Sequence, residues 1–230
     1  MEKVDELISR VEVAIDFGLD VERLSKNLLF KPRSKIWHSN ILEMSGMSTK
    51  EVRILLNELV TEETNYLEIG LYKGSTFVSA MLNNNPKSSI AIDLFEDFET
   101  ESGSQIYQAF LNNCKQFGVE KFTLIKNDSF KLTDNEKNQI KDINLYFYDG
   151  GHSYRDHYFA LKYFYDNLSD ACIFIVDDWC HPEAQYGTEL GLKNLNFKIH
   201  KEWILGKSQH DKSKGLSWHN GLYIGVIEKT

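Results

Sequence analysis

The chain has 230 residues and a formal net charge of −8, with 42% apolar and 26% charged residues. This composition is ordinary for a globular protein with one sizeable core. An acidic chain with no long Lys/Arg run is a poor candidate for nucleic-acid binding, so we expect no nucleic-acid partner. No apolar run approaches the ~20 residues of a membrane span. The charged start and three cysteines without C-x-x-C spacing predict free thiols and a cytoplasmic protein.

Residues 1–60 predict a helical segment. Two apolar series recur there at helical spacing: Val4, Leu7, Ile8 and Val11, then Val52, Leu55, Leu56 and Leu59. Ser48 and Glu51 have the spacing of a capping box that would begin the second helix. We expect residues 1–60 to form a helical lid or extension and residues 61–230 to form the main domain.

Short apolar strands alternate with helices after residue 61. The predicted strands are 66–69, 89–93, 122–126, 143–149, 171–177, 197–205 and 222–228. Helical stretches lie between most of them, for example 76–82, 104–117 and 154–167. Such alternation predicts an α/β fold with a mostly parallel sheet and helices on both faces. No helix separates the last two strands, which predicts an antiparallel C-terminal strand.

The turn after the first predicted strand contains two glycines, Gly70 and Gly74, preceded by Glu68. A glycine-bearing turn between a strand and a helix lets a ligand approach free backbone N–H groups. The spacing lacks the third glycine of dinucleotide binders. A tight turn that needs glycine only for its geometry is the alternative. The E-x-G-x-x-x-G pattern resembles motif I of the class I S-adenosylmethionine (SAM)-dependent methyltransferases, which have a Rossmann-like fold with a seven-stranded sheet.

Polar residues also end the second and third predicted strands. Asp93 follows Gly70 by 23 residues, and its two oxygens can accept hydrogen bonds from both ribose hydroxyls of a cofactor. Asp128 and Ser129 follow the third strand and are candidates for the adenine side. For these residues, capping of the next helix or turn chemistry is the alternative.

Carboxylates end the fourth and fifth predicted strands. Asp149 follows one apolar run, and Asp177 and Asp178 follow the other. If these strands are neighbours, the three carboxylates converge at one edge and repel one another unless a cation is bound. Oxygen ligands favour a hard cation, Mg²⁺ first and Ca²⁺ or Mn²⁺ next. Capping of the following helices is the alternative.

This set resembles the metal-dependent O-methyltransferases, of the catechol type and of the macrocin sugar type. Asp149-Gly150-x-His152-x-Tyr154 and the Asp177-Asp178 pair carry the resemblance. It implies SAM as cofactor and a divalent cation, Mg²⁺, held by Asp149, Asp177 and Asp178. The cofactor contacts that it implies are Glu68, Gly70, Tyr72, Gly74, Ser75, Thr76, Asp93, Asp128, Ser129 and Asp149.

The residue that removes the acceptor proton does not follow from the resemblance. Catechol-type enzymes have Lys where this chain has His152, and some sugar enzymes have an acid where it has Gly151. We expect His152 to be the base beside Asp149, because an imidazole titrates near neutral pH. A histidine that only hydrogen-bonds the loop is equally compatible. His181 and Glu183 are the next candidates, and Trp37, Trp179 and Trp218 either line the acceptor pocket or pack in the core.

The predicted function is methyl transfer from SAM to a hydroxyl of a small polar acceptor. A sugar or glycosylated metabolite is the leading acceptor, and a catechol-like diol is next. Small molecules are then the only expected partners, apart from a second copy in a homodimer. The alternatives are a SAM- or dinucleotide-binding module without turnover and a SAM-fold enzyme linked to hydroxylation.

Overall fold

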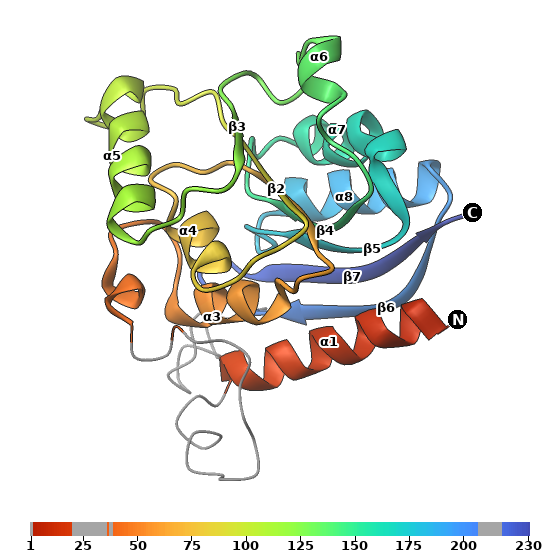
Figure 1. Ribbon diagram of the computed structural model, residues 1–230. Coiled ribbons are helices and arrows are strands. Elements are labelled where there is room, and N and C mark those ends of the chain that lie inside the picture. The colour runs from red at the N-terminus through yellow and green to blue at the C-terminus, as the bar shows by residue number, and fades with distance from the viewer. Residues whose placement is uncertain (1, 20–35, 37–38, 207–217) are drawn as a thin grey trace, which may run out of the picture.

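The computed structural model describes residues 2–19, 36, 39–206 and 218–230 (Figure 1). Within these residues lies a seven-stranded sheet with the strand order β3-β2-β1-β4-β5-β7-β6. Its strands are β1 (Asn65–Ile69), β2 (Ser88–Ile92), β3 (Thr123–Ile125), β4 (Ile143–Tyr148), β5 (Leu168–Val176), β6 (Phe197–Leu205) and β7 (Leu222–Lys229). Strand β7 is antiparallel to both of its neighbours, and the other pairs are parallel. The predicted α/β fold with an antiparallel C-terminal strand is confirmed.

Both faces of the sheet are apolar. Successive side chains of a strand point to opposite sides, so each central strand supplies apolar side chains to both faces. In β4, Leu145 and Phe147 pack into one buried cluster, and Tyr146 and Tyr148 pack into the other. A central strand that is buried on both faces must therefore be a continuous apolar run. This is the pattern that made β4 and β5 visible in the sequence.

Helices cover the two faces. The first face is covered by α1 (Glu2–Leu19), α3 (Lys50–Leu59), α4 (Ser75–Met81) and α5 (Gly103–Gln116). The second face carries α7 (Tyr154–Phe164) and α8 (Pro182–Asn194) (Figure 1). Shorter elements are η1 (Asn40–Glu43), α6 (Asp134–Lys137) and η2 (Tyr165–Asn167). Among the described residues, no helix has the length and apolar content needed to cross a membrane.

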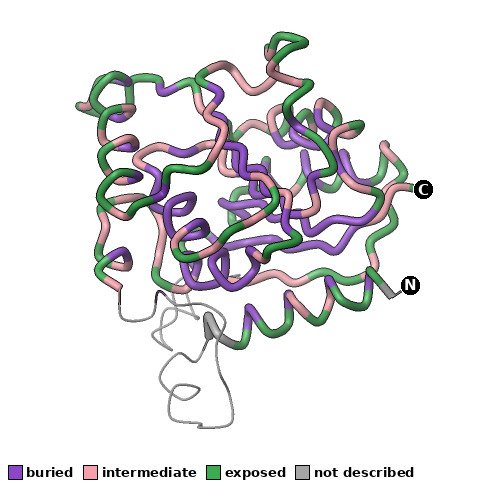
Figure 2. Tube along the Cα trace, in the orientation of Figure 1, coloured by how far each residue is buried: buried purple, intermediate pink, exposed green. Residues whose placement is uncertain are grey.

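The N-terminal helices pack against the sheet. Val4, Leu7 and Val11 turn one side of α1 into the first cluster, and the opposite side is exposed (Figure 2). The capping box predicted at Ser48 is wrong, because Thr49 is the N-cap and makes no side-chain cap bond. The Ser48 hydroxyl instead accepts a 2.9 Å hydrogen bond from Nε of Arg53.

Backbone hydrogen bonds continue the parallel ladder one residue past several strand ends. They run from the N–H of Gly70 to Ile92 (3.1 Å), of Asp93 to Ile125 (3.2 Å), of Asp149 to Ile69 (2.8 Å) and of Asp177 to Tyr148 (3.0 Å). The three aspartates are thus fixed in one row along the carboxyl-terminal edge of the sheet. In open α/β sheets this edge is where ligands bind.

Gly70 is required by the packing of this edge. Its φ is +86°, and a Cβ placed on it would lie 1.8 Å from the carbonyl oxygen of Asp149. The clash is with backbone, so no side chain can move away to relieve it. The glycine of the first turn therefore allows the ends of β1 and β4 to approach each other.

We expect Gly70→Ala to lower the free energy of unfolding by ~2 kcal/mol or more, through the left-handed backbone and the clash together. Gly118→Ala is a matched control, because Gly118 also has a positive φ (+68°) but no atom lies within 4 Å of the added Cβ. Its free energy of unfolding should fall by only ~1 kcal/mol, because alanine disfavours the left-handed backbone conformation. Urea unfolding of both variants gives the two numbers, and equal losses would show that the close approach is unimportant.

Candidate active site

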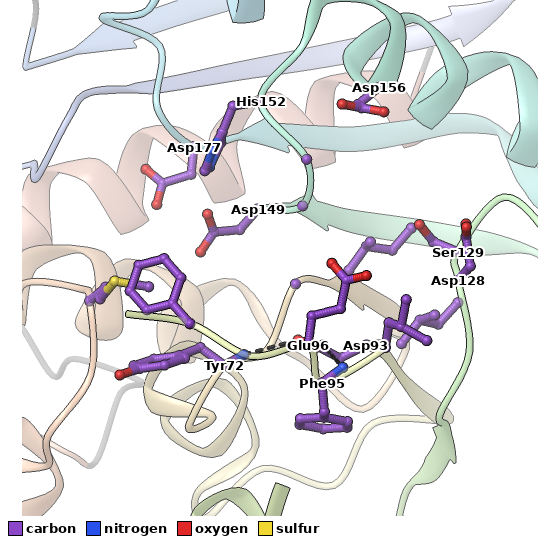
Figure 3. Close-up of a pocket in the computed structure, with 18 of the residues that line it drawn as sticks. Tyr72, Asp93, Phe95, Glu96, Asp128, Ser129, Asp149, His152, Asp156 and Asp177 are labelled. Atoms are coloured by element: carbon purple, nitrogen blue, oxygen red, sulfur yellow. Dashed lines mark hydrogen bonds between the residues drawn. The ribbon is translucent and has the colours of Figure 1, made fainter. Parts of the chain in front are cut away.

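A cavity of about 550 Å³ opens at the carboxyl-terminal edge of the sheet (Figure 3). Nine of the predicted site residues line it: Gly70, Tyr72, Asp93, Asp128, Ser129, Asp149, His152, Asp177 and Asp178. Asp93, Asp128 and Ser129 lie on one side of it, across from Asp149, His152 and Asp177 (Figure 3). The cavity thus has two halves. We call the half with Asp93, Asp128 and Ser129 the cofactor side and the half with Asp149, His152 and Asp177 the cation side, after the roles predicted from the sequence.

Asp93 organises the cofactor side. One carboxylate oxygen accepts hydrogen bonds from the backbone N–H groups of Leu71 (2.6 Å) and Tyr72 (3.0 Å). The other accepts from the N–H of Phe95 (2.6 Å). Asp93 thus ties the glycine turn to the end of β2. The oxygen that accepts from Phe95 has a second lone-pair site, so it can still accept a hydrogen bond from a ribose hydroxyl.

The third strand end forms a polar corner of the cavity. Asp128 accepts from the N–H of Phe130 (2.9 Å) and from Nζ of Lys131 (2.6 Å). The first bond is a local turn contact, which is the alternative that the sequence analysis gave for Asp128. Asp128, Ser129 and Phe130 all line the cavity, and the Phe130 ring adds an apolar surface beside the two polar residues.

Four predicted cofactor contacts do not line the cavity: Glu68, Gly74, Ser75 and Thr76. Glu68 is fully buried and accepts hydrogen bonds from the hydroxyls of Tyr66 (2.5 Å) and Thr76 (2.5 Å). It therefore ties β1 to the first turn of α4. A Cβ on Gly74 would meet the Phe110 ring at 2.6 Å. The structure corrects these four assignments to roles in the packing of the turn.

Asp149, His152 and Asp178 form the cation side. One potential ligand atom from each residue lies within 4.8 Å of the others. Asp177, which was predicted with them, does not belong to this group of three. It lines the same cavity, is 3% exposed, and its Oδ1 has no hydrogen-bond partner among the described residues. His152, which was predicted as a base, lies beside these carboxylates, with its Nε2 against Asp178 and most of its side chain exposed.

The carboxyl groups of this half have divergent pKa values. Burial raises the pKa of Asp149 well above its ordinary value, and Asp177 and Asp178 raise it further. Burial, and then the nearby Asp178, raise the pKa of Asp177 to about 7. Burial would also raise the pKa of Asp178, but hydrogen bonds from His152 and Asn220 outweigh it and lower that pKa to about 2. Crowded carboxylates of this kind require a positive charge or protons.

Asp178 is held in an unusual conformation by its neighbours. Its φ is +56°, in the left-handed region. Nε2 of His152 lies 2.8 Å from its Oδ2, and Nδ2 of Asn220 donates to its Oδ1 at 2.7 Å. Strained backbone is common where a site fixes a side chain for its function. The conformation turns the Asp178 carboxylate into the same cavity that Asp149 lines.

Sequence reasoning missed the contribution of the segment before β7. His219 and Asn220 line the cavity, and so does Met47, from the predicted N-terminal extension. The N–H groups of Trp179 and Cys180 bond to the carbonyls of Gly221 (3.0 Å) and Asn220 (2.7 Å), which fixes this segment beside the end of β5. No spacing in the sequence pointed to Asn220, because only the antiparallel pairing of β7 with β5 brings it there.

The second acid of the sugar-type pattern has no room here. A Cβ on Gly151 would lie 2.7 Å from Oδ2 of Asp156. Asp156 lines the cavity and caps α7 together with Ser153. The space that a side chain at position 151 would enter therefore already holds a carboxylate, one that sequence reasoning did not single out.

The remaining candidates lie outside the cavity lining. His181 is exposed with its Nε2 3.9 Å from Asp178, and Glu183 accepts from the N–H of Tyr154 (3.0 Å). Trp179 stacks on Tyr223 with ring centroids 4.6 Å apart, and Trp218 is buried in the first cluster. Core packing is therefore correct for both tryptophans. Trp37 lies outside the described residues.

Comparisons with known proteins indicate the class of domain to which part of this chain is similar. Residues 67–179, slightly less than half of the chain, match the model of a family described as a methyltransferase domain. This segment of the chain is therefore similar to a methyltransferase domain. The matched segment begins in β1 and ends just after the Asp177-Asp178 pair, so it contains both halves of the cavity except His219, Asn220 and Met47. A comparison with curated proteins gave no match.

Solved structures share the fold of this chain. A putative tRNA methyltransferase of Streptococcus pneumoniae with bound SAM has a TM-score of 0.53 at 16% identity, covering 80% of this chain and 73% of that one. TYW2 of M. jannaschii, also with SAM, has a TM-score of 0.54 at 14% identity, with 81% and 78% covered. A putative SAM-dependent methyltransferase from Streptococcus mutans has a TM-score of 0.55 at 12% identity, covering 80% and 49%.

These similarities contradict the prediction of a small-molecule acceptor without a nucleic-acid partner, of which the exclusion of nucleic acid came from composition. A putative tRNA methyltransferase from S. pneumoniae and the tRNA methyltransferase TrmK of B. subtilis are among the structures that share this fold. The exclusion from net charge was wrong because net charge averages over the whole surface. It does not report the local surface that meets a substrate.

We expect Asp93→Ala to weaken the binding of S-adenosylhomocysteine by ~1–3 kcal/mol, because ribose hydroxyls would lose an acceptor and the turn would lose its anchor. Calorimetric titration measures this. Urea unfolding of the same variant separates a loosened turn from an unfolded protein. Unchanged affinity would show that the carboxylate serves only the turn, and tighter binding of NADH than of S-adenosylhomocysteine would argue against SAM.

Burial raises the pKa of Glu68 from 4.5 to about 8, although its hydrogen bonds from Thr76 and Tyr66 oppose the shift. The folded protein then holds a proton that the unfolded chain releases at lower pH. Stability should therefore fall as pH rises between about 4.5 and 8. Glu68→Gln should flatten this decline, with the difference measured by urea unfolding at pH 5 and pH 8 in chelator. Parallel curves for the two proteins would show that Glu68 is ionised throughout.

Proposed function

We propose that this methyltransferase transfers a methyl group from SAM to a hydroxyl oxygen that is held at Asp149, Asp177 and Asp178 with a divalent cation. The observation that carries this proposal is the convergence of three strand-end carboxylates in the half of the cavity away from Asp93. The proposal names the atom that is methylated, and leaves the size and class of the acceptor to experiment.

The residues present fit a divalent cation. Oδ1 of Asp177 is buried and lacks a hydrogen-bond partner in the described chain, although an ionised oxygen in that position requires a donor or a metal. The raised pKa values of Asp149 and Asp177 reflect burial and the mutual repulsion that a bound cation relieves. Mg²⁺ is the assignment that oxygen ligands alone favour.

A bound cation would hold the acceptor oxygen and lower the pKa of its proton. The chain supplies the positioning. Asp93 and the glycine turn fix the cofactor on one side, and the row of strand ends fixes Asp149 and Asp177 across from it. The two reactants are thereby brought together by rigid parts of the sheet, and orientation of this kind accounts for much of enzymatic rate enhancement.

Methyl transfer to tRNA is a second candidate. It is favoured by the fold shared with tRNA methyltransferases, at 16% identity or less. The two candidates differ in the atom that receives the methyl group and in the need for a cation. A hydroxyl oxygen gains acidity from a cation, whereas a ring nitrogen already has a lone pair for the attack.

The test is transfer of labelled methyl from SAM to a panel of tRNA transcripts and hydroxyl-bearing acceptors, with and without EDTA. The methylated atom is then identified by mass spectrometry. O-methylated product that disappears with EDTA and returns with added cation supports the proposal. Transfer only to a base nitrogen at full rate in EDTA supports the second candidate and overturns the first.

Asp178→Ala should abolish cation-dependent transfer, a loss of ~10²-fold or more in kcat, and leave S-adenosylhomocysteine affinity within about threefold. The reason is that Asp178 contacts His152, which lies across the cavity from Asp93 (Figure 3). Calorimetry and the methyl-transfer assay measure the two effects on one preparation. If affinity for the cofactor falls as much as turnover, Asp178 supports the whole cavity rather than the acceptor half.

A further inference from the structure

We propose that His152 is a ligand of the cation, and that the site therefore selects a first-row transition-metal ion such as Mn²⁺, Fe²⁺ or Co²⁺ over Mg²⁺. This inference rests on the cation site of the proposed function. It differs from the prediction made from the sequence, which used oxygen ligands alone and assigned His152 to proton transfer.

The geometry of the imidazole supports a ligand role. Nε2 of His152 points into the carboxylate cluster, 2.8 Å from Oδ2 of Asp178. It belongs to the set of three ligand atoms that lie within 4.8 Å of one another. Atoms bound to one transition-metal ion lie up to about 4.2 Å apart, so the three atoms are close enough to share an ion after they move toward one another. A proton acceptor for the substrate would instead require this nitrogen to be free.

The loop around His152 is held in place. The Tyr148 hydroxyl donates to the carbonyl of Gly151 at 3.1 Å, just before the histidine. Immediately after it, Ser153 and Asp156 form the capping box that begins α7. Contacts on both sides of a ligand fix its orientation, as supporting contacts do in known metal sites. The imidazole therefore need not be ordered when the ion binds.

A second observation points to an ion rather than to a simple histidine–carboxylate pair. Asp177 lines the same cavity, and its Oδ1 is buried and accepts no hydrogen bond from the described residues. Asp177 lies beside Asp149 and His152 in the cavity (Figure 3). One ion among these residues would satisfy that oxygen and the crowded carboxylates together.

Chemistry of the donor set then decides the metal. Carboxylate oxygens alone suit Mg²⁺ and Ca²⁺, whereas imidazole nitrogen suits iron, zinc, copper and nickel and is well accepted by manganese and cobalt. Mg²⁺ also gives up its water reluctantly and is commonly held by one or two carboxylates. A mixed set of two or three carboxylates and one imidazole therefore favours the transition-metal ions.

The experiment compares Co²⁺ with Mg²⁺ on metal-free full-length protein, by calorimetric titration without SAM. Transition-metal ions bind most protein sites more tightly than Mg²⁺, so the decisive quantity is the change that a variant makes in the Co²⁺/Mg²⁺ affinity ratio. We expect His152→Gln to weaken Co²⁺ by about tenfold or more and Mg²⁺ by less than about threefold. The visible spectrum of bound Co²⁺ should change as well, because a nitrogen ligand is lost.

His200→Gln is the matched control. His200 also pairs with a carboxylate, its Nε2 lying 2.7 Å from Glu228, but it does not line the cavity. This variant should leave both affinities and the cobalt spectrum unchanged. Asp149→Asn should weaken both metals.

Equal weakening of both metals in His152→Gln, or no change, overturns the ligand assignment, and so does an unchanged cobalt spectrum. The absence of any binding to the wild-type protein overturns it too. Failure of the proposed function has a different signature. It appears as a lack of cation-dependent methyl transfer, whatever the binding ratio of the two metals.

Discussion

The register of the parallel strands at their carboxyl ends is the constraint on which the site depends. Asp93, Asp149 and Asp177 each donate a backbone N–H to the last residue of the neighbouring strand. Side chains that are distant in sequence are thereby fixed in one row by bonds that also hold the sheet together. Displacing the backbone of any of these aspartates means breaking the sheet edge, so the places from which their side chains project are set by the same bonds as the fold.

Repulsion among these carboxylates is the cost of that arrangement. Burial and proximity raise the pKa values of Asp149 and Asp177, while His152 and Asn220 lower the pKa of Asp178. Asp149 and Asp177 therefore favour protons or a cation, whereas the ionised form of Asp178 is already stabilised by hydrogen bonds. An ion in the cavity would compete with the His152–Asp178 bond, which couples cation binding to the conformation of the loop before α7.

Much of this architecture was readable from the sequence because its signals are local. Apolar runs that end in aspartate gave β4 and β5, and the missing helix before residue 222 gave the antiparallel strand. Asp149, Asp177 and Asp178 were found for the same reason. Glu68 was misassigned because a strand-end acid looks the same in sequence whether it faces a cavity or the hydroxyls of Tyr66 and Thr76.

What could not be read from the sequence depends on contacts between distant segments. Asn220 reaches Asp178 only because β7 pairs with β5, and Met47 borders the cavity only through the packing of the N-terminal segment. His152 was visible as a residue, but its partner was not, and the partner determines its chemistry. A histidine whose Nε2 contacts a carboxylate beside other carboxylates can share an ion with them, which its place in the sequence does not reveal.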